Sequence, residues 1–186
     1  AASDVYKRQV VAYPTDSAYA LGCRLADKNA LDRIRRIRQL DDKHNFTLMC
    51  KDLSEIATYA KVSNQGYRSL KAHTPGPYTF ILPASNEVPR RILTKRRTVG
   101  IRVPDNAIAL ALLADLDKPL MSVTLRMPGD EYPLIDPWEI RDLLQPQVDL
   151  VIDGGYCGME ATTVIDLLEE VPRVVRTGLG AVEDFV

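Results

Sequence analysis

The sequence has little of what several protein classes require. Its 186 residues include three cysteines, with no Cys-x-x-Cys pair, and two histidines. This composition argues against a disulfide scaffold, a cysteine zinc site and a histidine-rich metal centre, and it fits a reducing cytoplasm. The longest apolar run, residues 107–114, spans eight residues, against the roughly 18 that cross a bilayer. We therefore expect a cytoplasmic protein with no membrane span and no tightly bound metal.

Common catalytic signatures are also missing. The chain contains no His-Glu-x-x-His, no Walker loop and no Gly-x-Ser-x-Gly, which disfavours a zinc peptidase, a P-loop site and a serine hydrolase. Its length suits one domain that buries about 70% of its unfolded surface. Residues 1–9 carry no signal peptide and no periodic pattern. We interpret them as a non-native scar, expect residues 10–186 to form the domain, and expect a native segment to be missing before Val10.

Charge is divided unevenly along the chain. The formal net charge is -1, but residues 1–105 hold 19 basic and 10 acidic side chains, whereas residues 106–186 hold 5 and 15. A dense basic cluster lies near the end of the first range and contains Arg90, Arg91, Lys95, Arg96 and Arg97. Such a cluster indicates an anionic partner, a nucleotide or RNA, although a solvated basic face without a ligand is the alternative.

The hydrophobic periodicity alternates between strand and helix. Predicted strands cover residues 10–13, 46–50, 78–82, 98–103, 120–124, 148–152, 163–167 and 173–176. Predicted helices cover residues 28–40, 53–60, 65–72 and 106–116, with another that begins at Asp136. Alternation of this kind predicts a single-domain α/β fold, a mixed sheet with flanking helices.

Polar side chains gather where the predicted strands end. Thr15 and Ser17 follow the first strand, where open α/β sheets tend to bind ligands, although an ordinary turn is the alternative. Ser122 and Thr124 stand two residues apart and thus share one face of a strand, either toward a cleft or within the packed sheet. Lys43 and His44 precede another strand, where they either contact a phosphate or are loop residues without a ligand.

Taken in order, these segments resemble the YrdC family. The resemblance rests on Tyr13-Pro14-Thr15-Asp16 with Gly22, Pro75-Gly76-Pro77-Tyr78-Thr79-Phe80, Val99-Gly100-Ile101-Arg102-Val103-Pro104, Thr162-Thr163-Val164-Ile165-Asp166 and Val175-Arg176-Thr177-Gly178. Residues 44–49, 88–91 and 154–156 are most similar to the YciO branch. The resemblance implies a twisted sheet with a concave basic face, once described as a double-stranded RNA-binding fold.

The resemblance also implies a reaction. Characterised enzymes of the family make threonylcarbamoyl-AMP from L-threonine, bicarbonate and ATP with Mg²⁺, for the tRNA modification t6A, and release pyrophosphate. By resemblance, Thr15, Ser17 and Thr162 hold threonine, and the nucleotide meets His44, Thr79, Arg102, Ser122 and Arg176. Phosphoryl transfer of this kind depends on positioning and charge neutralisation more than on a nucleophile.

The chain departs from the family pattern around the expected catalytic cations. Where the family has Lys-x-Arg, this chain has Arg38-Gln39-Leu40, and Thr124 and Arg126 replace the serine and the asparagine of a Ser-x-Asn motif. We expect Arg38, Thr124 and Arg126 to form the catalytic set, with Arg126 supplying the missing charge. The alternative is a noncatalytic protein that binds nucleotides or double-stranded RNA. The basic cluster predicts weak RNA binding in either case.

Overall fold

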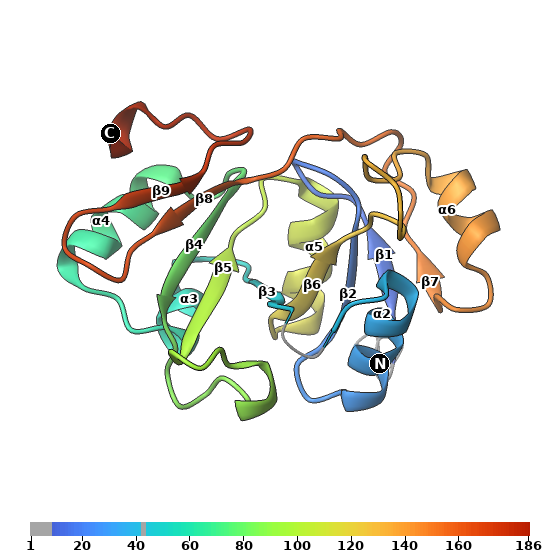
Figure 1. The fold of residues 1–186 in the computed structure, drawn as a ribbon, viewed down its shortest axis with the longest axis horizontal. Coiled ribbons are helices and arrows are strands. Elements are labelled where there is room, and N and C mark those ends of the chain that lie inside the picture. Colours follow the sequence, from blue (N-terminus) through green and yellow to red (C-terminus); the bar gives the residue numbers. More distant parts are fainter. Residues whose placement is uncertain (1–8, 42–43) are drawn as a thin grey trace.

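The computed structural model describes residues 9–41 and 44–186, and within them all strands join one mixed sheet. The sheet order is β7-β1-β2-β6-β3-β5-β4-β8-β9 (Figure 1). The strands are β1 (Val11–Tyr13), β2 (Ala20–Arg24), β3 (Thr47–Met49), β4 (Tyr78–Pro83), β5 (Thr98–Arg102), β6 (Leu120–Thr124), β7 (Leu150–Val151), β8 (Thr163–Asp166) and β9 (Arg173–Arg176). The predicted single-domain α/β fold is confirmed. Residues 1–8, which belong to the segment that we interpret as a non-native scar, lie outside the described residues.

Strand β2 is the one strand that the sequence prediction left out. Its sequence, Ala-Leu-Gly-Cys-Arg, lacks the β-branched and aromatic residues typical of strands. Antiparallel pairing with β1 on one side and β6 on the other nevertheless holds it in the sheet. Strands β3 and β7 are shorter than the predicted 46–50 and 148–152, because pairing partners, not apolar runs alone, set where a strand ends.

The helices begin within one residue of their predicted starts. They are α2 (Lys28–Arg38), α3 (Leu53–Tyr59), α4 (Asn64–His73), α5 (Ala107–Leu116) and α6 (Pro137–Leu144), with 3₁₀ turns η1 (Arg90–Ile92) and η2 (Glu183–Phe185). Asp27 caps α2 by accepting a hydrogen bond from the Ala30 N–H at 3.0 Å. A side-chain cap of this kind satisfies an amide that the first turn leaves without a partner. Among the described residues, no helix is both long and apolar enough to cross a membrane.

Helix α2 ends at Arg38, two residues before the predicted end. Gln39 adopts the left-handed conformation, with φ 53°, and turns the chain. The Leu40 N–H donates to the Arg35 carbonyl at 2.9 Å, and the Leu40 side chain packs against the core. This combination is typical of a helix C-terminus closed by an apolar residue. Leu40 therefore stabilises the end of α2.

The two faces of the sheet carry different side chains. Register places Leu48, Ile101 and Met121 on one face, packed in the larger core with α2, α3, α4 and α6. The other face carries Met49 and Leu120, which pack under α5. Along β4, β5 and β6 that second face continues with smaller or polar residues, Thr79, Gly100, Arg102, Ser122 and Thr124. Helix α5 leaves this part of the face free to form a cleft.

Candidate functional site

A cavity of about 630 Å³ lies on the polar face of β4, β5 and β6. Every residue that the family resemblance assigns to threonine, to the nucleotide or to the catalytic set lines it. These residues are Thr15, Ser17, Arg38, His44, Thr79, Arg102, Ser122, Thr124, Arg126, Thr162 and Arg176. The structure thus brings together side chains that the sequence spreads over more than 160 positions, and we call this space the main cavity.

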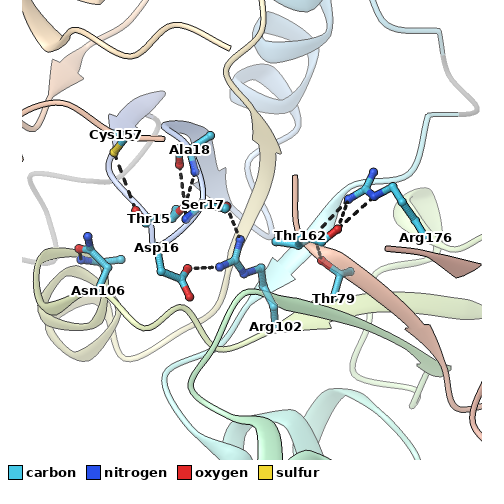
Figure 2. A network of polar contacts seen from close by, with 11 residues as sticks. Thr15, Asp16, Ser17, Ala18, Thr79, Arg102, Asn106, Cys157, Thr162 and Arg176 are labelled. Atoms are coloured by element: carbon cyan, nitrogen blue, oxygen red, sulfur yellow. Dashed lines mark hydrogen bonds and ion pairs between the residues drawn. The ribbon is translucent and has the colours of Figure 1, made fainter. Parts of the chain in front are cut away.

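A buried ion pair stands at one wall of the main cavity. Arg102 at the end of β5 pairs with Asp16 and donates a hydrogen bond to the Ser17 Oγ at 3.1 Å (Figure 2). Only 5% of the Arg102 side chain and 11% of the Asp16 side chain is exposed. Burial lowers the pKa of Arg102, whereas the Asp16 charge opposes this change. The Arg102 Nε and the Asp16 Oδ2 are buried without a hydrogen-bond partner among the described residues, so the pair retains capacity for another polar group.

The Thr15 hydroxyl organises the turn after β1. It donates to the Ala18 carbonyl at 2.6 Å and accepts from the N–H groups of Ser17 and Ala18, both at 3.1 Å. Its proton and its lone pairs are therefore all engaged within the turn. In this structure Thr15 shapes the wall, and the Ser17 Oγ lies 3.1 Å from the Thr15 Oγ1 while it accepts a hydrogen bond from Arg102. The role of both residues in threonine binding stays a prediction.

Ser122 is held by a tyrosine that the sequence analysis gave no role at the site. The fully buried Tyr13 hydroxyl hydrogen-bonds the Ser122 Oγ, and burial raises the pKa of Tyr13, although this hydrogen bond opposes the rise. A phenol is a better donor than an alcohol, so the favoured arrangement has Tyr13 donating and the Ser122 proton available to the cavity. Gly22 leaves room for this contact, because a Cβ there would stand 2.8 Å from Tyr13 and 3.1 Å from the Ser122 Oγ.

Two threonines and an arginine form the opposite wall. The hydroxyls of Thr79 and Thr162 lie 2.8 Å apart, and Arg176 donates to the Thr162 carbonyl at 2.9 and 3.1 Å (Figure 2). The backbone after Arg176 can lie this close to the Thr162 strand because residue 178 is glycine: a Cβ there would stand 2.3 Å from the Ala161 carbonyl oxygen. Arg176 itself is exposed, so its remaining donors face solvent and the cavity.

A third part of the wall is cationic. The end of α2 places Arg38 so that it donates to the Thr124 carbonyl at 2.8 Å, and its Nε is buried without a hydrogen-bond partner among the described residues. Burial and, second, the charge of Arg126 lower the pKa of Arg38. Burial and, second, Arg38 lower the pKa of His44, with Asp41 opposing and Arg126 adding to the effect. Arg38 and Arg126 therefore repel each other across this wall, and an anion bound between them would relieve the repulsion.

The basic cluster lies in the connection between β4 and β5. Its five predicted residues are all exposed, which suits either an anionic partner or a solvated surface. They do not form one site, because a second cavity is lined by Arg91 and Lys95 but not by Arg90, Arg96 or Arg97. Lys43, proposed as a phosphate contact, lies outside the described residues.

Several cavity residues escaped the sequence analysis. Glu131 and Tyr132 follow β6, and Met159 and Glu160 precede β8; all four are exposed and line the main cavity. The segments that contain them form neither helix nor strand, so hydrophobic periodicity could not identify them. Only their nearness in sequence to Arg126 and Thr162 indicated that they belong to the site. In the described part of the chain no group of three or more His, Cys, Asp or Glu side chains could hold a metal ion.

The fold and the cavity define a class: an α/β domain whose sheet carries a cationic, hydroxyl-rich cleft on one face. The Sua5/YciO/YrdC family model, described as "Telomere recombination", matches residues 5–178. The chain therefore belongs to the Sua5/YciO/YrdC family, and the resemblance noted in the sequence is confirmed.

Named relatives place the chain within this family. It is 57% identical to the protein named "Uncharacterized protein YciO" of Escherichia coli K12 over 98% of this chain and 89% of that protein. The crystal structure of E. coli YciO covers all of this chain and 91% of its own, with a TM-score of 0.93 at 56% identity. The threonylcarbamoyl-AMP synthase of Pyrococcus abyssi is 30% identical over 96% of this chain, which spans 53% of that protein. A structure of P. abyssi Sua5 with L-threonine, 28% identical, covers 95% of this chain and 52% of its own, with a TM-score of 0.86.

Proposed function

We propose that the main cavity catalyses ATP-dependent formation of threonylcarbamoyl-AMP. The observation that carries this proposal is the convergence of four arginines, Arg38, Arg102, Arg126 and Arg176, with the hydroxyl of Ser122 on one sheet face. Cations and hydroxyl donors of this kind suit the charge that spreads over a transferring phosphoryl group. The P. abyssi synthase relative and the P. abyssi Sua5 structure with L-threonine support the same assignment.

The proposed reaction needs no covalent intermediate on the protein. The threonine amine adds to the bicarbonate carbon and water leaves, which gives a carbamate. A carbamate oxygen then attacks the α-phosphorus of ATP; the bond from that phosphorus to the bridging oxygen breaks, and pyrophosphate leaves. Mg²⁺ enters with ATP as part of the substrate. Ser122 and Arg176 meet the nucleotide, whereas the walls formed by Thr15–Ser17 and Thr162 receive threonine.

Arg126 replaces the charge that this chain lacks at Leu40. Leu40 packs against the core and does not line the main cavity, so it is not positioned to contact substrate. Arg126 lines the cavity and lowers the pKa of Arg38 through its charge. Two cations therefore face one space from different elements, the end of α2 and the segment after β6, and together they neutralise the phosphates.

Pyrophosphate release tests this function. We expect release with ATP, threonine and bicarbonate, and loss of release when any one of the three is omitted. Arg126→Ala should reduce turnover by about 100-fold, which corresponds to about 3 kcal/mol of transition-state stabilisation, without changing the melting temperature. Threonine-dependent turnover that survives Arg126→Ala unchanged would reject the compensating role of Arg126.

Nucleotide binding without chemistry is the second candidate, favoured by the departures at Leu40 and Arg126. In that case the protein binds ATP or AMP, but no pyrophosphate appears under any substrate combination. The exposed cluster of Arg90, Arg91, Lys95, Arg96 and Arg97 is compatible with weak RNA binding. Such binding should weaken steeply with salt, by a log-log slope of about -0.7 per phosphate contact for single strands.

A further inference from the structure

A second cavity of about 350 Å³ adjoins the main cavity. Four lining residues, His44, Asn45, Ile92 and Thr94, belong to both cavities. The second cavity is lined by Arg35 of α2, by residues 44–45 and by residues 91–95 of the β4–β5 connection, which contains η1. We call it the hairpin cavity. The two spaces are therefore adjacent, on either side of these four residues.

The charge of the hairpin cavity has one sign. Arg35, Arg91 and Lys95 line it, and no described Asp or Glu does. Arg35 contacts Asp32 outside the cavity at 3.3 Å and lies over the Phe46 ring, 5.5 Å from its centroid. Its Nε is buried without a hydrogen-bond partner in the described structure. The Arg35 guanidinium is thus held in place by packing and by one ion pair, while one of its donors is unused.

The β4–β5 connection reaches across to α2 through one of these cations. Arg91 donates to the Ala26 carbonyl at 3.4 Å, just before the start of α2. This weak contact leaves most of the Arg91 donors free while it orients the side chain. Arg90, Arg96 and Arg97 come from the same connection but line neither cavity. The basic cluster therefore divides into two residues that face a cavity and three that do not.

We propose that the hairpin cavity is a subsite for the terminal phosphates of a nucleotide whose α-phosphate lies in the main cavity. The proposal rests on the proposed function, since that reaction requires a place for the leaving pyrophosphate. Guanidinium and ammonium groups bind phosphate oxygens through charge-assisted hydrogen bonds. Arg38 and Arg126 line the main cavity, and Arg35, Arg91 and Lys95 provide the cations for the end of a triphosphate that extends beyond it. A neighbouring nucleotide of an RNA strand would present the same phosphate chemistry, and the test separates the two.

Calorimetry with defined anions tests the subsite on the full chain. The double variant Arg91→Gln/Lys95→Gln removes two cavity cations, and Arg90→Gln/Arg96→Gln removes two matched charges from the same connection. The titrants are inorganic pyrophosphate, ATP and AMP, and a short single-stranded RNA is titrated in parallel. We expect the first double variant to lose about tenfold or more in affinity for pyrophosphate and ATP but less than about twofold for AMP. The control variant should stay within about twofold of wild type for all three.

Each other outcome either overturns the phosphate subsite or shows that the proposed function fails. Equal losses in both double variants would show that only the diffuse positive field matters, and no loss in either would show that the cavity does not hold phosphate. Loss of binding to a short single-stranded RNA, with pyrophosphate affinity unchanged, would assign the surface to RNA instead. If wild type binds pyrophosphate but no AMP, the proposed function fails while the subsite stands. All four substituted residues are exposed, and a melting temperature within about 2 °C of wild type would confirm that the variants fold.

Discussion

Replacing Arg102 by methionine tests the physical basis of the main cavity wall. Arg102→Met keeps much of the side-chain volume but leaves the Asp16 carboxylate buried without its partner, since only 11% of the Asp16 side chain is exposed. Removing one partner of a buried ion pair lowers the free energy of unfolding by about 3–5 kcal/mol. For a chain of this size each kcal/mol corresponds to about 2–4 °C. The melting temperature should therefore fall by about 6–20 °C.

A surface pair in the same sheet provides the matched control. Arg173 pairs with Asp166 at 3.0 Å, but 73% of the Arg173 side chain is exposed, so Arg173→Met should cost less than about 1 kcal/mol. Adding Asp16→Asn to Arg102→Met should recover part of the loss, because it removes the unpaired charge. Thermal unfolding measured for wild type and the three variants makes the comparison. Equal melting temperatures for Arg102→Met and Arg173→Met would refute the reasoning about burial.

Two further predictions concern the cavity walls. Gly22→Ala should force the Tyr13–Ser122 contact apart, because the added Cβ would stand 2.8 Å from Tyr13. We expect thermal unfolding to show about 1–3 kcal/mol of destabilisation and calorimetry to show weaker ATP binding. An unchanged melting temperature together with unchanged ATP affinity would contradict this prediction. Burial and, second, the charge of Arg38 lower the pKa of His44, which favours its neutral form. A bound phosphate favours the charged form of His44, so ATP affinity should rise as the pH falls toward 5. This rise in affinity should be severalfold larger in wild type than in His44→Gln. Parallel pH profiles of ATP affinity in the two proteins would show that His44 does not contact the anion.

The polar face of the sheet could be predicted because strand periodicity is strict. In β6, Ser122 and Thr124 alternate with buried Met121 and Val123, so the sequence alone indicated that both hydroxyls point the same way. Resemblance to the family supplied the rest of the site, since the cavity residues come from strands and turns far apart in the chain. The structure confirms that they lie together.

Turn geometry and tertiary contacts account for what the sequence could not predict. The engagement of the Thr15 hydroxyl depends on the path of the turn to Ala18, which no motif specifies. Leu40 belongs to the predicted helix 28–40, but the left-handed Gln39 ends the helix and turns Leu40 onto the core. The division of the basic cluster likewise depends on how the β4–β5 connection folds back toward α2. The first two orientations depend on the path of a local turn and the third on a contact between distant segments, and no sequence motif specifies any of them.

Incorporation of bicarbonate carbon into a nucleotide adduct tests the central claim most directly. Wild type is incubated with ATP, threonine and labelled bicarbonate, and both the labelled adenylate and the released pyrophosphate are quantified. Our account predicts that the two appear in equal amounts, only with threonine present, and that both fall about 100-fold in Arg126→Ala. Folded wild-type protein that binds ATP but forms neither product, or that releases pyrophosphate without incorporating carbon, would contradict it.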